Sequence, residues 1–532
     1  MADPKLNLLT EPIITVRKQD RKRAGVMLPG VLELLGEDAV SDFPALRPHQ
    51  QHAWHAFLVQ LAAIALHRAG KTEPKQDAAS WAAMLRALTD GTDEPWCLVV
   101  DDLSKPAFMQ PPVPEKTLTS EKGKKWDLVH CADELDILVT SKNHDIKAAR
   151  SSRSTSEQWL FALLTLQTMQ GYSGRYNHGI ARMNSGYGNR PCVALAPSHS
   201  WGQRFKRDVK VLARGRGSII EIHQYAEHGG SALLWLEPWD GATSISPKRC
   251  DPWFIEICRR VRLAGNADTI VARTTSTKSP RLSDESDAHG QTGDPWTPIE
   301  KTGVKAPKTL TVPAAGFGYN RVQELLFSGN IEHSLTQIPQ PDDPSAMLFV
   351  ASAMTRGPGK TEGLHQRFVA VPGRVRLMLG NTDERARLAK LAETRVTAVD
   401  KVRRKVLHIA LCALLQGARE KLDFRDKEDD RWLSALDAAV DEIFFERLWR
   451  DLDLDPGDAQ TSWERELLEL ARAQLDDAIE SAPIPSARRY RAIAAAEGMF
   501  EGMARKHFTD CFKKGAMQHG TRDDDDATSA AD

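Results

Sequence analysis

The feature that most constrains the fold is a change of hydrophobic pattern near residue 381. Beyond it, apolar residues recur at intervals of three and four along four segments: Val399, Val402, Val406, Ile409 and Ala413; Leu433, Leu436, Val440 and Phe444; Leu468, Ala471, Leu475 and Ile479; and a last stretch from about Ser486 to His507. This spacing places the apolar side chains on one face of an α-helix. Four such helices with connections of modest length are typical of a bundle. Residues 381–516 are therefore predicted to form a four-helix bundle.

Local signals refine the limits of this bundle. Asn381 with Glu384, and Thr461 with Glu464, have the spacing of a capping box, which predicts a helix start at each position. The last residues, 517–532, are polar and include the run Asp523 to Asp526. A segment of this composition cannot bury enough apolar surface to fold, so an acidic disordered tail is expected.

Residues 1–380 mix helical and extended patterns. Helices are expected over residues 49–68, 80–88 and 156–169, and strands over residues 8–16, 193–196, 218–222 and 233–236. The overall expectation is an α+β chain, with a large irregular mixed N-terminal domain followed by the C-terminal four-helix bundle.

Composition narrows the class of protein. No apolar stretch approaches the length that crosses a membrane, and the N-terminus has no apolar signal core, so a cytoplasmic protein without membrane contact is expected. The seven cysteines are scattered without a C-x-x-C pair, which supports neither a disulfide framework nor a zinc ribbon. His49, His52 and His55 share one side of a helix but lack an acidic ligand within the turn, so no metal site is expected there.

The segment TRGPGKTEG, residues 355–363, ends with the Gly-Lys-Thr of a phosphate-binding loop. Such a loop needs a further glycine at position 354, where this chain has methionine, and a helix after the turn. Here the following residues end in the apolar run Phe368-Val369-Ala370-Val371 and a proline, which indicates a strand. A hairpin is therefore favoured over a nucleotide site.

Two segments have a composition suited to nucleic acid. Residues 169–191 combine five glycines with three tyrosines and three arginines, which allow close backbone approach, stacking and phosphate neutralisation. Residues 204–216 hold six basic side chains against one acidic side chain, and Arg259, Arg260 and Arg262 form a smaller cluster. An ordered loop with ordinary solvated charges explains the same composition equally well. No G-x-S-x-G motif or activated nucleophile stands out, so no enzyme is indicated.

Several segments in order resemble one known family. They are NLLTEPIITVR (7–17), FPALRPHQQHAWHAFLVQLAAIAL (43–66), PAFMQ (106–110), the glycine-rich stretch, DPWFIEICRRVRL (251–263) and DPWTPI (294–299). Together they resemble the CasA large subunit of the type I-E CRISPR surveillance complex, Cascade. The likeness covers nearly the whole chain, including the terminal bundle.

The resemblance implies a non-catalytic subunit without a cofactor that inspects the protospacer-adjacent motif (PAM) in double-stranded target DNA and helps start unwinding. Base pairing with the crRNA then reads the sequence. The implied partners are crRNA, the backbone, handle-capping, small and crRNA-processing subunits, and a helicase–nuclease effector.

The family's functional residues map onto four places in this chain. The glycine loop falls on Gly171, Tyr172, Ser173, Gly174 and Arg175, and the lysine finger on Lys278, with Arg281 as an alternative. The wedge hairpin falls on Gly359, Lys360 and Thr361, where Lys360 replaces the glutamine that relatives often carry. A loop that contacts crRNA and neighbouring subunits falls on Lys147, Arg150 and Arg153.

Two other hypotheses about the function are compatible with the sequence alone. A nucleic-acid-dependent ATPase would use Gly359, Lys360 and Thr361 to bind nucleotide, and a stand-alone DNA-binding protein would bind duplex tightly without partners.

Overall fold

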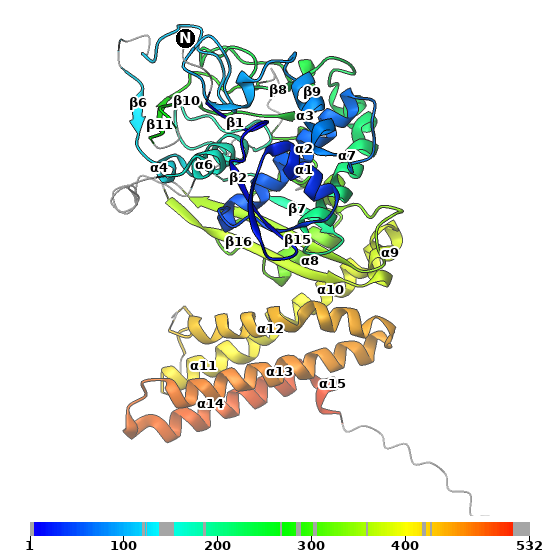
Figure 1. Ribbon diagram of the computed structural model, residues 1–532. Coiled ribbons are helices and arrows are strands. Elements are labelled where there is room, and N and C mark those ends of the chain that lie inside the picture. Colours follow the sequence, from blue (N-terminus) through cyan, green and yellow to red (C-terminus); the bar gives the residue numbers. More distant parts are fainter. Residues whose placement is uncertain are drawn as a thin grey trace, which may run out of the picture. The chain divides into compact units, whose positions relative to one another are not determined.

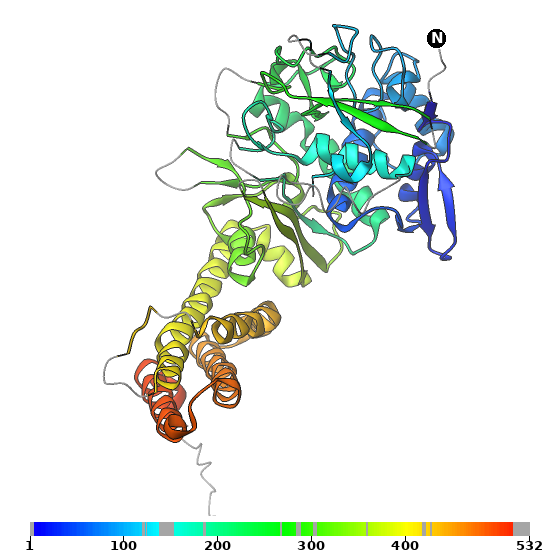
Figure 2. The same cartoon turned by 90° about the vertical axis from the view of Figure 1, so that its left-hand side faces the viewer.

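The computed structural model divides the chain into two units, Met1–Ala389 and Lys390–Asp532 (Figures 1 and 2). It describes residues 5–119, 123, 125–137, 154–184, 188–266, 269–283, 289–301, 306–357, 360–417, 422–425 and 428–513. The predicted tail, 517–532, lies outside these residues. In the described part of the chain, none of the helices has the length and apolar character needed to cross a bilayer.

The first unit mixes helices with small sheets, which confirms the predicted α+β class. Its helices are α1 (Leu28–Gly36), α2 (Gln51–Arg68), α3 (Ala78–Ala87), α4 (Ala132–Leu135), α6 (Ser156–Met169), α7 (Trp201–His223), α8 (Tyr319–Phe327) and α9 (Gly373–Leu379). Its strands are β1 (Lys5–Asn7), β2 (Ile14–Lys18), β3 (Arg23–Val26), β4 (Val40–Asp42), β5 (Cys97–Val99), β6 (Asp127–Val129), β7 (Cys192–Ala196), β8 (Ser231–Leu233), β9 (Cys250–Ile255), β10 (Arg260–Ala264), β11 (Val271–Thr275), β12 (Ile299–Glu300), β13 (Lys308–Thr309), β14 (Ile331–Glu332), β15 (Met347–Gly357) and β16 (Lys360–Val371).

Two three-stranded sheets position the candidate site. One has the order β16-β15-β7 with antiparallel neighbours, and the other has the order β10-β11-β6. The segment predicted as a strand at residues 218–222 is instead the end of α7. That prediction was wrong because a short apolar run does not distinguish a strand from a turn of helix, and the preceding amphipathic residues extend the helix through it.

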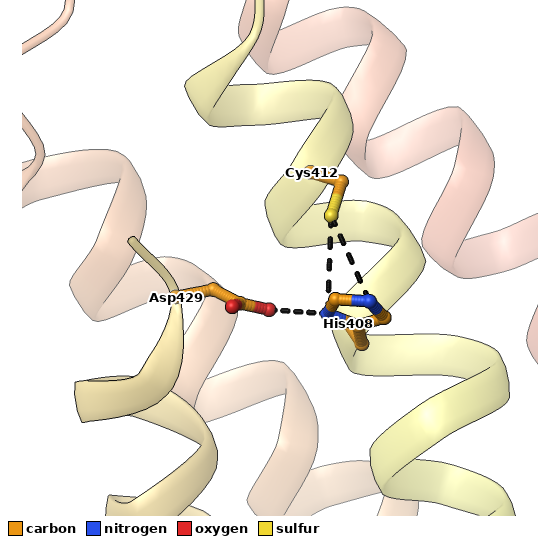
Figure 3. A group of neighbouring side chains, drawn as sticks. All are labelled: His408, Cys412 and Asp429. Atoms are coloured by element: carbon orange, nitrogen blue, oxygen red, sulfur yellow. Dashed lines mark hydrogen bonds and ion pairs between the residues drawn. The ribbon is translucent and has the colours of Figure 1, made fainter. Parts of the chain in front are cut away.

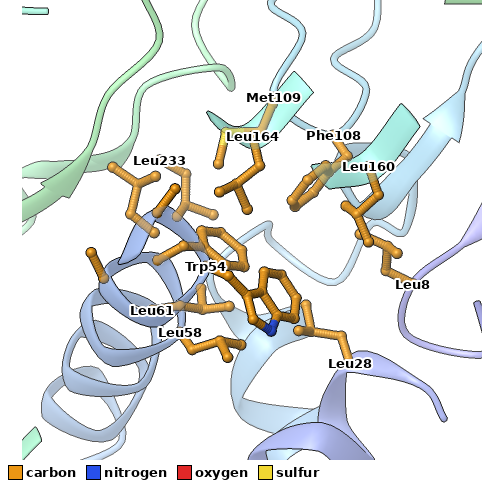
Figure 4. Close-up of a cluster of buried hydrophobic side chains, with 14 of the residues drawn as sticks. Leu8, Leu28, Trp54, Leu58, Leu61, Phe108, Met109, Leu160, Leu164 and Leu233 are labelled. Carbon is orange, nitrogen blue, oxygen red and sulfur yellow. The ribbon is translucent and has the colours of Figure 1, made fainter. Parts of the chain in front are cut away.

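The core of the first unit is built around α2 and α6. Every residue from His52 to Leu66 is buried, so α2 lacks a solvent face and is an internal helix. Trp54 stacks on Phe57 with ring centroids 5.6 Å apart and meets the edge of Phe161 from α6 at 5.2 Å. Leucines from α2 and α6 and the side chain of Phe108 surround the indole ring (Figure 4).

Two histidines, His49 just before α2 and His55 within it, pair with buried carboxylates. The imidazole of His49 lies 2.8 Å from Asp136, which also accepts a hydrogen bond from Gln50 at 2.7 Å. His55 lies 2.8 Å from Asp208 on α7. Buried charges need such partners, so these two histidines join elements of the core.

His52 has no carboxylate partner of this kind among the described residues. Burial, assisted by the nearby His49 and Arg190, lowers the pKa of its imidazole to about 3 from an ordinary 6.5. The folded protein thus keeps His52 neutral while the unfolded chain protonates it below pH 6.5. The free energy of unfolding therefore decreases as the pH falls from about 6.5 towards about 3.

We expect the wild-type protein to lose about 2 kcal/mol more stability than His52→Asn between about pH 7.5 and about pH 5. Urea unfolding at the two pH values measures this difference directly. Equal losses in the two proteins would show that His52 takes up a proton in the folded state.

The second unit is helical. It holds the rest of α10 (Thr382–Val402), which continues through a π-helical turn at Arg403–Leu407 into α11 (His408–Leu415), followed by α12 (Asp430–Arg450), α13 (Pro456–Ser481), α14 (Ser486–His507) and the short α15 (Thr509–Phe512). The predicted stripe Leu433, Leu436, Val440 and Phe444 is buried, as amphipathic packing requires. This helical region confirms the predicted second half of the fold.

Of the two predicted helix starts, the one at Asn381 is observed and the one at Thr461 is not. The Asn381 side chain accepts hydrogen bonds from the N–H groups of Asp383 at 3.0 Å and Glu384 at 3.1 Å, as a helix cap should. The predicted start at Thr461 is wrong. The helix α13 begins at Pro456, where Asp455 caps it and proline suits the first turn.

Candidate nucleic-acid interface

The glycine-rich stretch after α6 folds into a closed loop, here called the glycine loop, residues 171–180. The N–H of Ser173 donates to the carbonyl of Asn177 at 3.1 Å, and the N–H of Ile180 donates to Gln170 at 2.9 Å. A Cβ on Gly179 would lie 2.3 Å from the carbonyl carbon of Gly171, so only glycine lets the two arms of the loop close. The predicted residues Gly171, Tyr172, Ser173, Gly174 and Arg175 all lie in this loop.

Arg259 holds the glycine loop from beneath. Its guanidinium donates to the carbonyl oxygen of His178, to Ser173 Oγ at 3.1 Å and to the carbonyl of Asn177 at 3.5 Å. The backbone of Arg259 is fixed in turn by Gln167 of α6, whose Oε1 accepts from its N–H at 2.8 Å. The side chain of Arg259 is buried.

Lys278 lies beside the glycine loop. The N–H of Thr277 donates to the carbonyl of Tyr176 at 3.0 Å, and the N–H of Lys278 donates to Gly241 at 2.7 Å. The imidazole of His178 lies 3.2 Å from the Lys278 carbonyl. The Lys278 side chain is exposed, whereas Arg281 is only 2% exposed and its guanidinium binds the carbonyls of Leu234, Glu237 and Pro238. Of the two candidates for the finger, only Lys278 can reach a ligand from solvent.

A cavity of about 790 Å³ opens between these segments. Tyr176 and Asn177 of the glycine loop line it together with Lys278, Arg259 and residues of β6 and β11. Its rim carries both signs of charge, since Asp127, Glu134 and Asp240 also line it. The glycine loop and Lys278 therefore face one shared space.

The hairpin interpretation of residues 355–363 is confirmed. Strands β15 and β16 pair from Met347↔Val371 to Gly357↔Lys360, with a bulge between Thr355 and Arg356 (Figure 2). A strand thus follows the turn where a nucleotide-binding loop requires a helix, so the phosphate-loop interpretation is wrong. Lys360 and Thr361 begin β16, and Gly359 lies outside the described residues.

Arg356, near the end of β15, is close enough to Arg259 to feel its charge. Burial lowers the pKa of the Arg356 guanidinium, and the positive charge of nearby Arg259 lowers it further. Along its length the hairpin is attached to the rest of the unit, because Leu364 packs against the hydrophobic core and Ser352 Oγ lies 3.5 Å from His52 Nδ1. The hairpin is thus the third element near Arg259.

Most residues of the other basic clusters pair with groups of the same unit. On α7, four of the six basic residues form ion pairs within the unit: Arg207 with Asp343, Lys210 with Glu73, Arg214 with Asp342 and Arg216 with Asp251. Arg260 binds Glu115 at 2.7 Å, and Arg262 donates to the carbonyl of Val100 at 2.7 Å. Most of these cations therefore serve the fold, which composition alone could not reveal. Lys147, Arg150 and Arg153 lie outside the described residues.

Fold and site together define a class of protein: a mixed α+β unit that presents a glycine loop, an exposed lysine and a β-hairpin, followed by a helical unit. A family model, "CRISPR-associated protein Cse1", matches residues 7–474. The chain belongs to this family, the Cse1 or CasA large subunit of type I-E CRISPR complexes. The resemblance inferred from the sequence segments is thus confirmed.

Solved structures share the fold at low sequence identity. Cse1 from Acidimicrobium ferrooxidans is 14% identical with a TM-score of 0.64, covering 96% of this chain and 99% of its own. CasA from Thermus thermophilus is 14% identical with a TM-score of 0.64, covering 94% and 100%. Cse1 from Thermobifida fusca is 15% identical with a TM-score of 0.62, covering 94% and 98%. A search of curated proteins found no significant match.

Proposed function

We propose that this chain is the PAM-reading subunit of a crRNA-guided complex and that it has no catalytic role of its own. It would inspect the PAM as duplex DNA, help open the first base pairs, and leave the reading of the remaining sequence to base pairing with the crRNA. The observation that carries this proposal is the pairing of two elements: Arg259 holds the glycine loop closed, and the exposed Lys278 segment is hydrogen-bonded to that loop.

Each of the three elements suits a different part of this task. The glycine loop offers backbone and the exposed Arg175 to a groove, where a close approach needs small residues. Lys278 offers an exposed cation on a flexible stem, a type of side chain that binds base acceptors and phosphates. The paired strands of the hairpin run as far as Gly357 and Lys360, and we assign to this end the parting of the first DNA base pair. Minor-groove readout by such groups is degenerate, which favours tolerance of several PAM sequences.

The proposed partners follow from family membership. They are crRNA, double-stranded target DNA, the backbone, handle-capping, small and crRNA-processing subunits, and a helicase–nuclease effector. Lys147, Arg150 and Arg153 are proposed to contact crRNA and neighbouring subunits. An isolated chain should then bind duplex weakly and acquire PAM preference only on assembly.

The test is target binding by the reconstituted crRNA complex carrying Lys360→Ala, on a normal duplex and on one whose PAM-proximal pairs are already open. We expect binding to the closed duplex to fall by about 10-fold or more, because one charge-assisted contact is worth about 1.5–3 kcal/mol, and binding to the opened duplex to recover. Lys22→Ala, an exposed lysine in the turn after β2, is the matched control.

Two outcomes would contradict the proposal. Wild-type binding of both duplexes by Lys360→Ala would remove the hairpin from the opening step. If the isolated chain bound duplex tightly and had the same PAM preference as the assembled complex, a stand-alone DNA-binding protein would be favoured.

A further inference from the structure

The helical unit holds a cluster of three ligand-type side chains that the proposed function does not use. His408 and Cys412 lie one turn apart on α11, and Asp429 lies just before α12 (Figure 3). One nitrogen, one sulfur and one carboxylate oxygen all lie within 4.8 Å of one another. Cys412 and Asp429 are buried, and the His408 side chain is 19% exposed.

The distances between the sulfur and nitrogen atoms of the cluster suit a metal ion with tetrahedral coordination. Bonds of about 2.3 Å to sulfur and about 2.0 Å to nitrogen would hold those two atoms about 3.6 Å apart. Cys412 Sγ lies 3.8 Å from His408 Nδ1 and 3.9 Å from Nε2. The Asp429 carboxylate contacts Nδ1 directly, so these two groups must part slightly to admit an ion.

Local backbone features direct the three side chains to one point. The π-helical turn at Arg403–Leu407 directly precedes His408, and such turns are common at functional sites because the extra residue re-aims the side chains after it. Asp429 occupies the N-cap of α12, yet its side chain makes no capping hydrogen bond and reaches His408 instead. An acid at this position would ordinarily cap the helix.

We propose that His408, Cys412 and Asp429 bind one Zn²⁺ ion, which ties α11 to the start of α12. Thiolate, imidazole and carboxylate together form a ligand set that zinc accepts, and the two anionic ligands would neutralise the ion. His408 and Asp429 also line a cavity of about 640 Å³, from which water could supply the fourth ligand. Two arginines of its rim have acidic partners of their own, Arg403 with Asp437 and Arg404 with Asp400.

The test uses the full chain without a histidine tag, stripped with a chelator and titrated with Co²⁺ and then with Zn²⁺. We expect one Co²⁺ per chain with a thiolate charge-transfer band, displaced by Zn²⁺, and a thermal unfolding midpoint raised by several degrees. Cys412→Ser should lose the band, and Asp429→Asn should weaken binding by more than about 100-fold, since even outer-shell partners cost 10–100-fold. The matched control is Cys511→Ser, in the same unit, which should bind as wild type does.

Two results would overturn the site. The first is a wild-type chain that takes up no Co²⁺ or Zn²⁺ at micromolar concentration. The second is an unchanged charge-transfer band in Cys412→Ser. Asp429→Asn keeps the test decisive if Cys412→Ser fails to fold, because asparagine preserves the shape of the carboxylate and removes its charge.

Discussion

Replacing Arg259 with leucine should reduce PAM-dependent target binding by the assembled complex about 10- to 100-fold. The substitution removes the donors that hold the carbonyls of His178 and Asn177 and the hydroxyl of Ser173. Hydrogen bonds from a charged donor contribute about 1.5–3 kcal/mol, and each 1.4 kcal/mol is tenfold in affinity. Arg259→Lys should rescue little, because an ammonium cannot reproduce the planar fork. Equilibrium binding of PAM-containing and PAM-mutated duplexes measures the effect.

Arg281→Leu is the matched control for this experiment. Arg281 is also buried and donates to three backbone carbonyls, but those carbonyls lie at residues 234–238 and not in the glycine loop. If both variants lost PAM preference equally, the effect would be general destabilisation. Gly179→Ala gives independent evidence, since its new Cβ would force the loop open against Gly171 without touching any charge.

The second large effect is expected in the helical unit, at the buried pair Arg395–Asp451. Arg395 is 0% exposed, its guanidinium lies 2.9 Å from Asp451, and it sits over the Trp463 ring at 5.4 Å. Asp451→Asn leaves this cation buried without a counter-charge, which costs about 3–5 kcal/mol. Hydrogen exchange of peptides from α12 and α13 across a urea series reports the loss where it occurs.

Two further variants test the reason for this loss. The double replacement Arg395→Met with Asp451→Leu should recover most of the stability, because removing both charges removes the desolvation cost. Asp400→Asn breaks an exposed pair with Arg404 and should cost no more than about 1 kcal/mol. A double variant as unstable as Asp451→Asn would show that packing, and not charge, sets the stability of this site.

Buried arginines recur through the first unit, and their roles clarify how the candidate interface is built. Arg182 and Arg262 donate to backbone carbonyls of strands or loops, as Arg259 does. Such a guanidinium satisfies several carbonyls of irregular backbone at once, which a buried loop otherwise cannot do. The irregular segments that present Lys278 and the glycine loop are thus held by buried side chains.

The sequence predicted the site's parts better than their arrangement. The hairpin was predicted from residue type and order, whereas the glycine loop and Lys278, with Arg281 as its alternative, were assigned by resemblance to the CasA family. The contacts of the glycine loop with Arg259 and with the Lys278 segment could not be predicted, because residues 171–180, 259 and 278 belong to segments far apart in the chain. The sequence signal for Arg259 was a basic cluster, and the same signal on α7 marks ion pairs of the fold.

The sequence by itself determined the helical second half, the α6 and α2 helices and the hairpin, because hydrophobic spacing and turn residues act over a few neighbouring positions. Tertiary structure alone decided which cations are buried and which face solvent. Arg281 is buried and Lys278 is exposed, although only three positions separate them in the sequence. It also decided that Cys412, four residues from His408, meets Asp429 across a loop. Burial and long-range pairing depend on contacts between distant segments, and no local pattern encodes them.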